Sequence, residues 1–153
     1  SKVDALQYNI HKWFQREIEI INLEMTRINA DRILFFNVET HKLDAFHVPL
    51  PALIIDCLDN NDARLITYDI SNSRKIPTIH IGFSDQFTFA IEWNEHYKTP
   101  SDITSGFDIC TQDGAASFVK MVASLASQTI QEYLKSGQKK EFIGNRLKLV
   151  ELK

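Results

Sequence analysis

Three polar side chains have the types and spacing of a magnesium site. Asp85 lies in a turn-like stretch, Glu92 follows seven residues later, and Asn94 comes after one spacer. Carboxylate and amide oxygens are the ligands that Mg²⁺ prefers, and a metal held this way can promote attack on a phosphodiester. His80 is a fourth candidate, because a histidine facing Glu92 could act with it as a general base.

The expected order of elements is a helix, several strands, a second helix and a final strand, which resembles in outline the PD-(D/E)xK nucleases. The resemblance covers only this order together with Asp85 and Glu92. Where those nucleases usually have a lysine, this chain has Asn94, and no proline precedes Asp85. The lysine stabilises the attacking hydroxide, so its absence favours an interpretation in which Asp85 forms a turn and Glu92 faces water. The magnesium-dependent nuclease is therefore our alternative.

Other catalytic and cofactor motifs are absent from the sequence. The five histidines share no zinc-binding spacing, and the scattered glycines form no phosphate-binding loop. The two cysteines, Cys57 and Cys110, lie in apolar stretches and form no C-x-x-C pair. We expect no cofactor, with Mg²⁺ as the alternative, and a reducing cytoplasm as the location.

The charge is unevenly distributed along the chain. Residues 39–113 contain twelve acidic and five basic side chains, a net charge of −7, whereas residues 135–153 contain six basic and two acidic ones, a net charge of +4. An acidic middle disfavours nucleic acid and favours a cationic partner. The basic C-terminal cluster lacks the interleaved aromatic residues of a single-strand binder. We therefore expect a small protein-binding or regulatory domain, of the kind found among inhibitors and immunity proteins that mask a basic partner.

The predicted contact residues combine acidic side chains with aromatic ones, because aromatic anchors rimmed by charge are typical of interfaces. They are Glu92, Trp93, Glu95, Tyr97, Asp102 and Asp108.

The clearest structural pattern is an alternation of apolar and polar residues between Thr78 and Trp93. Ile79, Ile81 and Phe83 alternate with small or polar residues, and a second alternation includes Phe87, Phe89, Ile91 and Trp93. Period-two alternation places the large apolar side chains on one face of a strand. The pattern predicts an antiparallel hairpin with one buried face and a connection at residues 82–85.

The remaining elements follow from weaker patterns. We predict strands at residues 33–38, 43–48 and 64–70, and a last strand at residues 142–152. Residues 52–58 are either a short helix or a buried strand. A helix is expected to start at Asp113 as its N-cap and to end at Gly137. This order predicts a single α+β domain over residues 1–153, a mostly antiparallel sheet with a long N-terminal helix, a second helix and a final short strand.

The N-terminal segment from Val3 to about Ala30 contains no glycine or proline, and its apolar residues recur at helical spacing. Trp13, Ile20 and Leu23 lie off the main apolar stripe and widen it. We therefore expect a long helix suited to a homodimer through these three residues. No stretch reaches the roughly 18 apolar residues that a membrane span needs, so no membrane association is expected.

Overall fold

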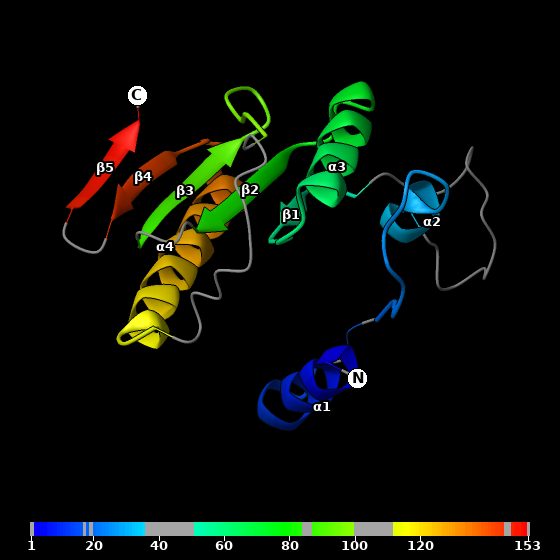
Figure 1. Ribbon diagram of the computed structural model, residues 1–153, viewed down its shortest axis with the longest axis horizontal. Coiled ribbons are helices and arrows are strands. Elements are labelled where there is room, and N and C mark those ends of the chain that lie inside the picture. Colours follow the sequence, from blue (N-terminus) through cyan, green and yellow to red (C-terminus); the bar gives the residue numbers. More distant parts are fainter. Residues whose placement is uncertain are drawn as a thin grey trace. The chain divides into compact units, whose positions relative to one another are not determined.

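The computed structural model of the protein describes residues 2–16, 18, 20–35, 51–83, 87–99, 112–145 and 148–152. Backbone contacts divide the chain into two compact units, Ser1–Pro51 and Ala52–Lys153 (Figure 1). The α+β class is confirmed, because helices accompany a five-stranded, mostly antiparallel sheet. The single domain over residues 1–153 stays a prediction. No helix of the described part is long and apolar enough to cross a membrane.

The first unit contains two short helices, α1 (Lys2–Phe14) and α2 (Ala30–Leu34). The prediction of one long helix to about Ala30 is wrong. Gln15 adopts a left-handed conformation with φ of 52°, and the following stretch is rich in isoleucine, whose branched side chain lowers helix propensity. The predicted strand at residues 33–38 begins inside α2, and the rest of it lies outside the described residues, as does the strand predicted at residues 43–48.

The second unit is built on a sheet with the strand order β1-β2-β3-β4-β5. The strands are β1 (Ile54–Asp56), β2 (Thr78–Phe83), β3 (Thr88–Trp93), β4 (Glu141–Asn145) and β5 (Lys148–Leu152). β1 pairs with β2 in parallel, and every other neighbouring pair is antiparallel. The hairpin between Thr78 and Trp93 is therefore confirmed, although β2 continues through Gly82 to Phe83.

A helix replaces one predicted strand. Residues 64–70 belong to α3 (Asn61–Ser73), which crosses from β1 to its parallel neighbour β2. The Asn60 side chain caps this helix by accepting a hydrogen bond from the backbone N–H of Ala63 at 3.1 Å. The buried residues Ala63, Ile66 and Thr67 recur at helical spacing. The strand was predicted because a short alternation of apolar and polar residues at 64–70 also fits the strand period. The ambiguity at residues 52–58 is settled in favour of a strand, β1.

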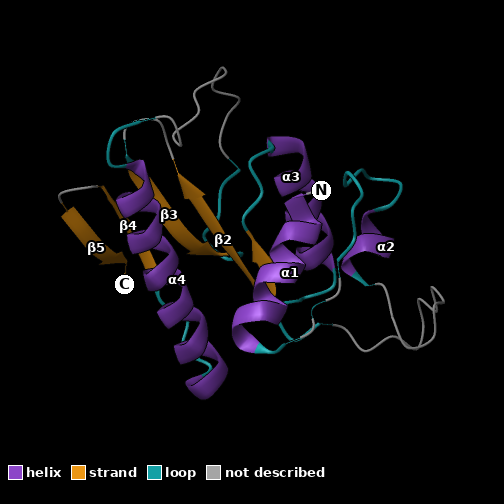
Figure 2. Ribbon diagram, turned by 90° about the horizontal axis from the view of Figure 1, so that it is seen from below, coloured by secondary structure: helices purple, strands orange, loops and turns teal. Residues whose placement is uncertain are grey.

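The helix α4 (Ala115–Ser136) packs on one face of the sheet (Figure 2). Its N-cap is Gly114 rather than the predicted Asp113, and its predicted end at Gly137 is confirmed, with Gly137 at a φ of 71°. The predicted last strand is in fact two strands, β4 and β5. The buried core joins side chains of the sheet to those of α4: Ile79, Ile81, Phe89, Ile91, Trp93, Phe118, Val122, Ala126 and Phe142.

The opposite face of the sheet is covered unevenly. α3 lies over β1 and β2, where Arg64 donates from Nη2 to the carbonyl oxygen of Ile81 at 2.9 Å. Farther along the same face, strand register places Gly82, Ala90, Ile143 and Val150 in one row across β2 to β5. Ile143 is 42% exposed and Val150 is 37% exposed. We call Ala90, Ile143 and Val150 the open row.

Candidate functional site

A chain of buried polar side chains lies on the face of the sheet that α3 covers. His80 of β2 points away from the hydrophobic core, because its neighbours Ile79 and Ile81 point into it. His80 Nδ1 lies 2.6 Å from Asp56 Oδ2, and His80 Nε2 lies 2.7 Å from Asn94 Oδ1. Asn94 in turn donates from Nδ2 to Ser71 Oγ at 3.0 Å. We call Asp56, His80, Asn94 and Ser71 the buried polar chain; it joins β1, α3, β2 and the residue after β3.

Asp56 has further partners that stabilise a carboxylate. Its Oδ1 accepts a hydrogen bond from the backbone N–H of Leu58 at 2.9 Å. Arg64 Nη1 lies 3.6 Å from Asp56 Oδ2, and both side chains are almost fully buried. A buried carboxylate needs such compensation, because its desolvation is costly.

Two tyrosines complete the surroundings of His80. The Tyr97 ring stacks on the imidazole at a centroid distance of 3.6 Å with the planes 6° apart, and the Tyr68 ring lies at 6.2 Å. The buried hydroxyl of Tyr97 makes no hydrogen bond with the part of the chain that the structure describes. Burial raises the pKa of this hydroxyl, and the nearby guanidinium of Arg64 partly offsets the effect. The imidazole is therefore enclosed by aromatic rings as well as by polar partners.

A second group of ionisable side chains lies beyond the end of β3. The buried Glu141 accepts from the backbone N–H of Trp93 at 2.8 Å through Oε1, and its Oε2 lies 2.7 Å from Nδ1 of the exposed His96. Glu141 therefore connects β4 to β3 and to the turn that follows.

Glu92 differs from Glu95, the acidic residue of the turn that follows β3. Register places it directly opposite His80, and it is half-buried. Burial and then the nearby carboxylate of Glu141 raise its pKa, an effect that His80, His96 and Lys98 partly offset. Glu92 thus holds a proton more readily than an ordinary carboxyl group.

The predicted contact residues do not form one exposed patch. The Trp93 ring is buried against the Tyr133 ring at a centroid distance of 4.5 Å, and the Tyr97 ring is buried against His80. Glu95 is exposed and forms an ion pair with Lys139. Asp102 and Asp108 lie outside the described residues. The contact role of all six residues stays a prediction.

The four residues of the nuclease alternative are also divided. His80, Glu92 and Asn94 meet where β2 and β3 pair, but Asp85 lies outside the described residues. Both ring nitrogens of His80 are engaged by Asp56 and Asn94. Across the described ranges, no group of three or more His, Cys, Asp or Glu side chains is arranged to hold a metal ion.

Sequence reasoning missed Asp56, Arg64 and Ser71 as members of this site. Asp56 interrupts the apolar stretch A-L-I-I-D-C-L, and that interruption was the one available signal of a buried acid. Arg64 and Ser71 could not be identified while residues 64–70 were interpreted as a strand, because only the helix brings both side chains to the same face.

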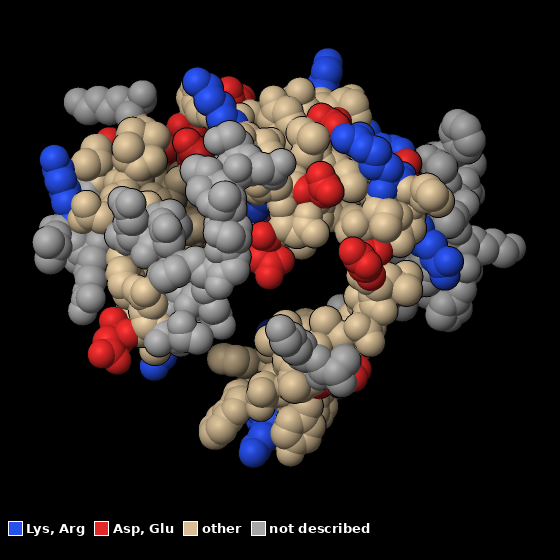
Figure 3. Space-filling view, in the orientation of Figure 1, with Lys and Arg blue, Asp and Glu red and all other residues tan. Residues whose placement is uncertain are grey.

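Charges are mixed rather than gathered on the visible face. Figure 3 shows Lys and Arg side chains interspersed with Asp and Glu side chains. Besides Glu95 with Lys139, Glu132 pairs with Lys140 at 2.9 Å. Because partners within the chain neutralise several acids, charge alone does not define a contact surface.

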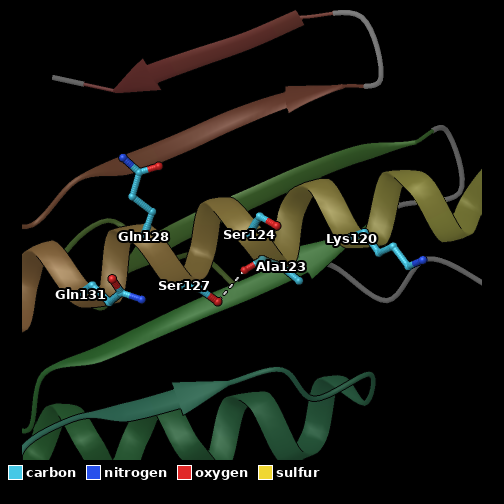
Figure 4. A pocket seen from close by; sticks show the side chains of 6 residues that line it. All are labelled: Lys120, Ala123, Ser124, Ser127, Gln128 and Gln131. Carbon is cyan, nitrogen blue, oxygen red and sulfur yellow. Dashed lines mark hydrogen bonds between the residues drawn. The ribbon is translucent and has the colours of Figure 1, made fainter. Parts of the chain in front are cut away.

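The outward face of α4 borders a hollow of about 600 Å³ (Figure 4). Its lining residues are Lys120, Ala123, Ser124, Ser127, Gln128 and Gln131. Ser127 Oγ donates to the backbone carbonyl of Ala123 at 2.8 Å, an ordinary contact within a helix. The hollow is thus an open depression along mostly uncharged side chains.

Comparison of the chain with protein-family models finds no match, and comparison with curated proteins finds no similar sequence.

Proposed function

We propose that this chain is a protein-binding or regulatory domain whose contact surface includes the open row. The observation that carries the proposal is the exposure of Ile143 and Val150 on neighbouring strands of a sheet face. In the described part of residues 52–153, α4 packs on the other face and α3 lies over β1 and β2. Full burial of a valine or isoleucine side chain contributes about 1.5–3 kcal/mol. Because Ile143 and Val150 are already more than half buried, a partner would gain only the remaining part of this free energy at each residue.

The composition supports a basic partner. The chain has a formal net charge of −3, and its residues 39–113 are its most acidic part. Glu92 lies on the same sheet face as the open row and has a raised pKa. A cationic side chain placed beside Glu92 would stabilise its carboxylate form. This arrangement supports an inhibitor or immunity-type protein that masks a cationic partner in the cytoplasm.

The experiment is affinity purification of the full chain from its native host, followed by mass spectrometry. We expect one stoichiometric basic protein in the eluate. Its reproducible absence would count against the proposal.

Self-association through the first unit is a separate proposal. Trp13 is 71% exposed near the end of α1, and Leu23 is exposed beyond it, while Ile20 is half-buried. Because α1 ends at Phe14, these three residues do not share one helical face. Light scattering that shows a monomer at high concentration would remove the homodimer.

The magnesium-dependent nuclease stays an alternative that no contact in the described residues favours. Calorimetry with Mg²⁺, together with a cleavage assay of the wild type and Glu92→Ala, distinguishes the two functions. Absence of both metal binding and cleavage would end the nuclease interpretation.

A further inference from the structure

The direction of each hydrogen bond in the buried polar chain can be deduced from its serine end. Ser71 Oγ donates its single proton to the backbone carbonyl of Tyr68 at 3.1 Å. Ser71 Oγ can therefore only accept from Asn94, so the atom of Asn94 that faces it must be the amide nitrogen. This orients the amide, and its carbonyl oxygen, Oδ1, faces His80.

The orientation of Asn94 determines one nitrogen of His80. Asn94 Oδ1 is an acceptor only, and it lies 2.7 Å from His80 Nε2, so Nε2 must carry a proton. The other nitrogen, Nδ1, lies 2.6 Å from Asp56 Oδ2, a distance that requires a second proton between them. The two protons belong either to an imidazolium beside a carboxylate or to a neutral imidazole beside a protonated Asp56.

The surroundings of the pair favour the ionic form. Asp56 accepts the backbone N–H of Leu58 and lies near the guanidinium of Arg64, and both stabilise a carboxylate. On the histidine side, the flat stacking of the Tyr97 ring suits a cation. The charged or titratable groups that face His80 in the described elements are Asp56 of β1, Arg64 and Tyr68 of α3, Glu92 of β3, and Tyr97 after β3.

We propose that the fold of residues 52–153 is organised around a doubly protonated His80, so that one bound proton links β1, α3, β2 and the segment after β3. Loss of this proton would leave a bare nitrogen facing a carboxylate oxygen, with no proton for the hydrogen bond between β1 and β2. The hydrogen bonds of the buried polar chain thus need this proton to join β1, α3, β2 and the segment after β3.

The test is nitrogen-15 NMR of the histidine rings in the full-length protein at neutral pH. We expect both His80 ring nitrogens to have the chemical shifts of protonated nitrogens, with two slowly exchanging N–H protons. A bare-nitrogen shift at Nδ1 would overturn the proposal, and the wild-type spectrum alone decides this.

Two variants sharpen the result. Asp56→Asn supplies an amide N–H that can donate to Nδ1, so the Nδ1 proton signal should disappear while the Nε2 signal remains. Asp59→Asn makes the same chemical change at an exposed position three residues away and should leave both signals in place. Retention of both His80 proton signals in folded Asp56→Asn would contradict the role of the carboxylate.

Discussion

At the scale of single residues, the hydrogen bonds of Ser71 show how little freedom the buried polar chain has. Ser71 Oγ donates its proton to the carbonyl of Tyr68, so it can only accept from Asn94. A buried donor that loses its acceptor keeps the full penalty of desolvation. Small changes at these positions should therefore have large effects on stability.

Two serines of α3 test this dependence. Ser71→Ala removes the acceptor of Asn94 Nδ2 in a fully buried site, and we expect it to lower the free energy of unfolding by about 1–3 kcal/mol. Ser73→Ala makes the same change at an exposed serine that donates to the carbonyl of Ile70 within the same helix, and the expected effect is within about 0.5 kcal/mol. Urea denaturation measures both. Equal effects would show that the buried chain adds no stability.

Glu92 and Glu95 are expected to change the stability of the protein with pH in opposite directions. Burial, followed by Glu141, raises the pKa of Glu92, so its contribution to stability is full at low pH and is lost as the pH rises through the raised value. Burial is the largest single effect on the pKa of Glu95 and acts to raise it. The hydrogen bond and charge of Lys139, a backbone hydrogen bond and the charge of His96 together outweigh burial and lower the pKa, so that contribution to stability is lost as the pH falls.

The corresponding glutamine variants should therefore diverge at neutral pH. Glu92→Gln should be more stable than the wild type at neutral pH and equal to it well below the ordinary carboxyl value of 4.5. Glu95→Gln should be less stable than the wild type at neutral pH. Urea denaturation across this pH range measures both, and a destabilised Glu92→Gln at neutral pH would refute the assignment.

At the scale of elements, the β3–β4–β5 meander requires a close approach at Gly144. A Cβ atom added there would lie 2.5 Å from the carbonyl oxygen of Lys148 and 2.9 Å from the Phe89 ring. Gly144→Ala should therefore destabilise the protein by about 1–3 kcal/mol through overpacking.

At Gly82 the nearest atoms are 3.8 Å away, on the Arg64 guanidinium. Gly82→Ala should cost nothing and could add up to about 1 kcal/mol. Thermal unfolding of the two variants compares them, and similar melting temperatures would argue against this packing.

The elements that the sequence predicts correctly are those with long, regular patterns. The hairpin from Thr78 to Trp93 has nearly full alternation, and α4 has a long apolar stripe with Gly137 at its end. α3 was misassigned because the seven-residue stretch 64–70 fits both the strand period and the helical period. The N-terminal helix was predicted too long, because an apolar stripe does not show where the backbone leaves the helical conformation, as it does at Gln15.

The candidate site was less predictable than the fold, for a physical reason. Its members come from β1, α3, β2 and the end of β3, and only the parallel crossover through α3 brings Asp56 and Ser71 to His80. The possibility of His80 and Glu92 facing each other did follow from the hairpin pattern, and the register places them opposite each other. The residues that bond His80 could not be predicted, because the alternation of apolar and polar residues does not show that α3 connects two parallel strands.

At the scale of the whole molecule, the two faces of the sheet differ in how the described residues cover them. Residues of β2, β3 and β4 meet α4 on the packed face, whereas the open row leaves Ile143 and Val150 in contact with solvent. This exposed apolar row is the surface that we propose a partner covers. The central claim is therefore that a partner protein covers the open row.

The most direct measurement is quantitative capture of the partner by two arginine variants. Ile143→Arg places a charge in the open row, and Met121→Arg places one at an equally exposed position, 43% against 42%, on α4. We expect Met121→Arg to recover the basic partner as the wild type does, and Ile143→Arg to lose it while remaining folded. Equal recovery by the two variants would contradict the account.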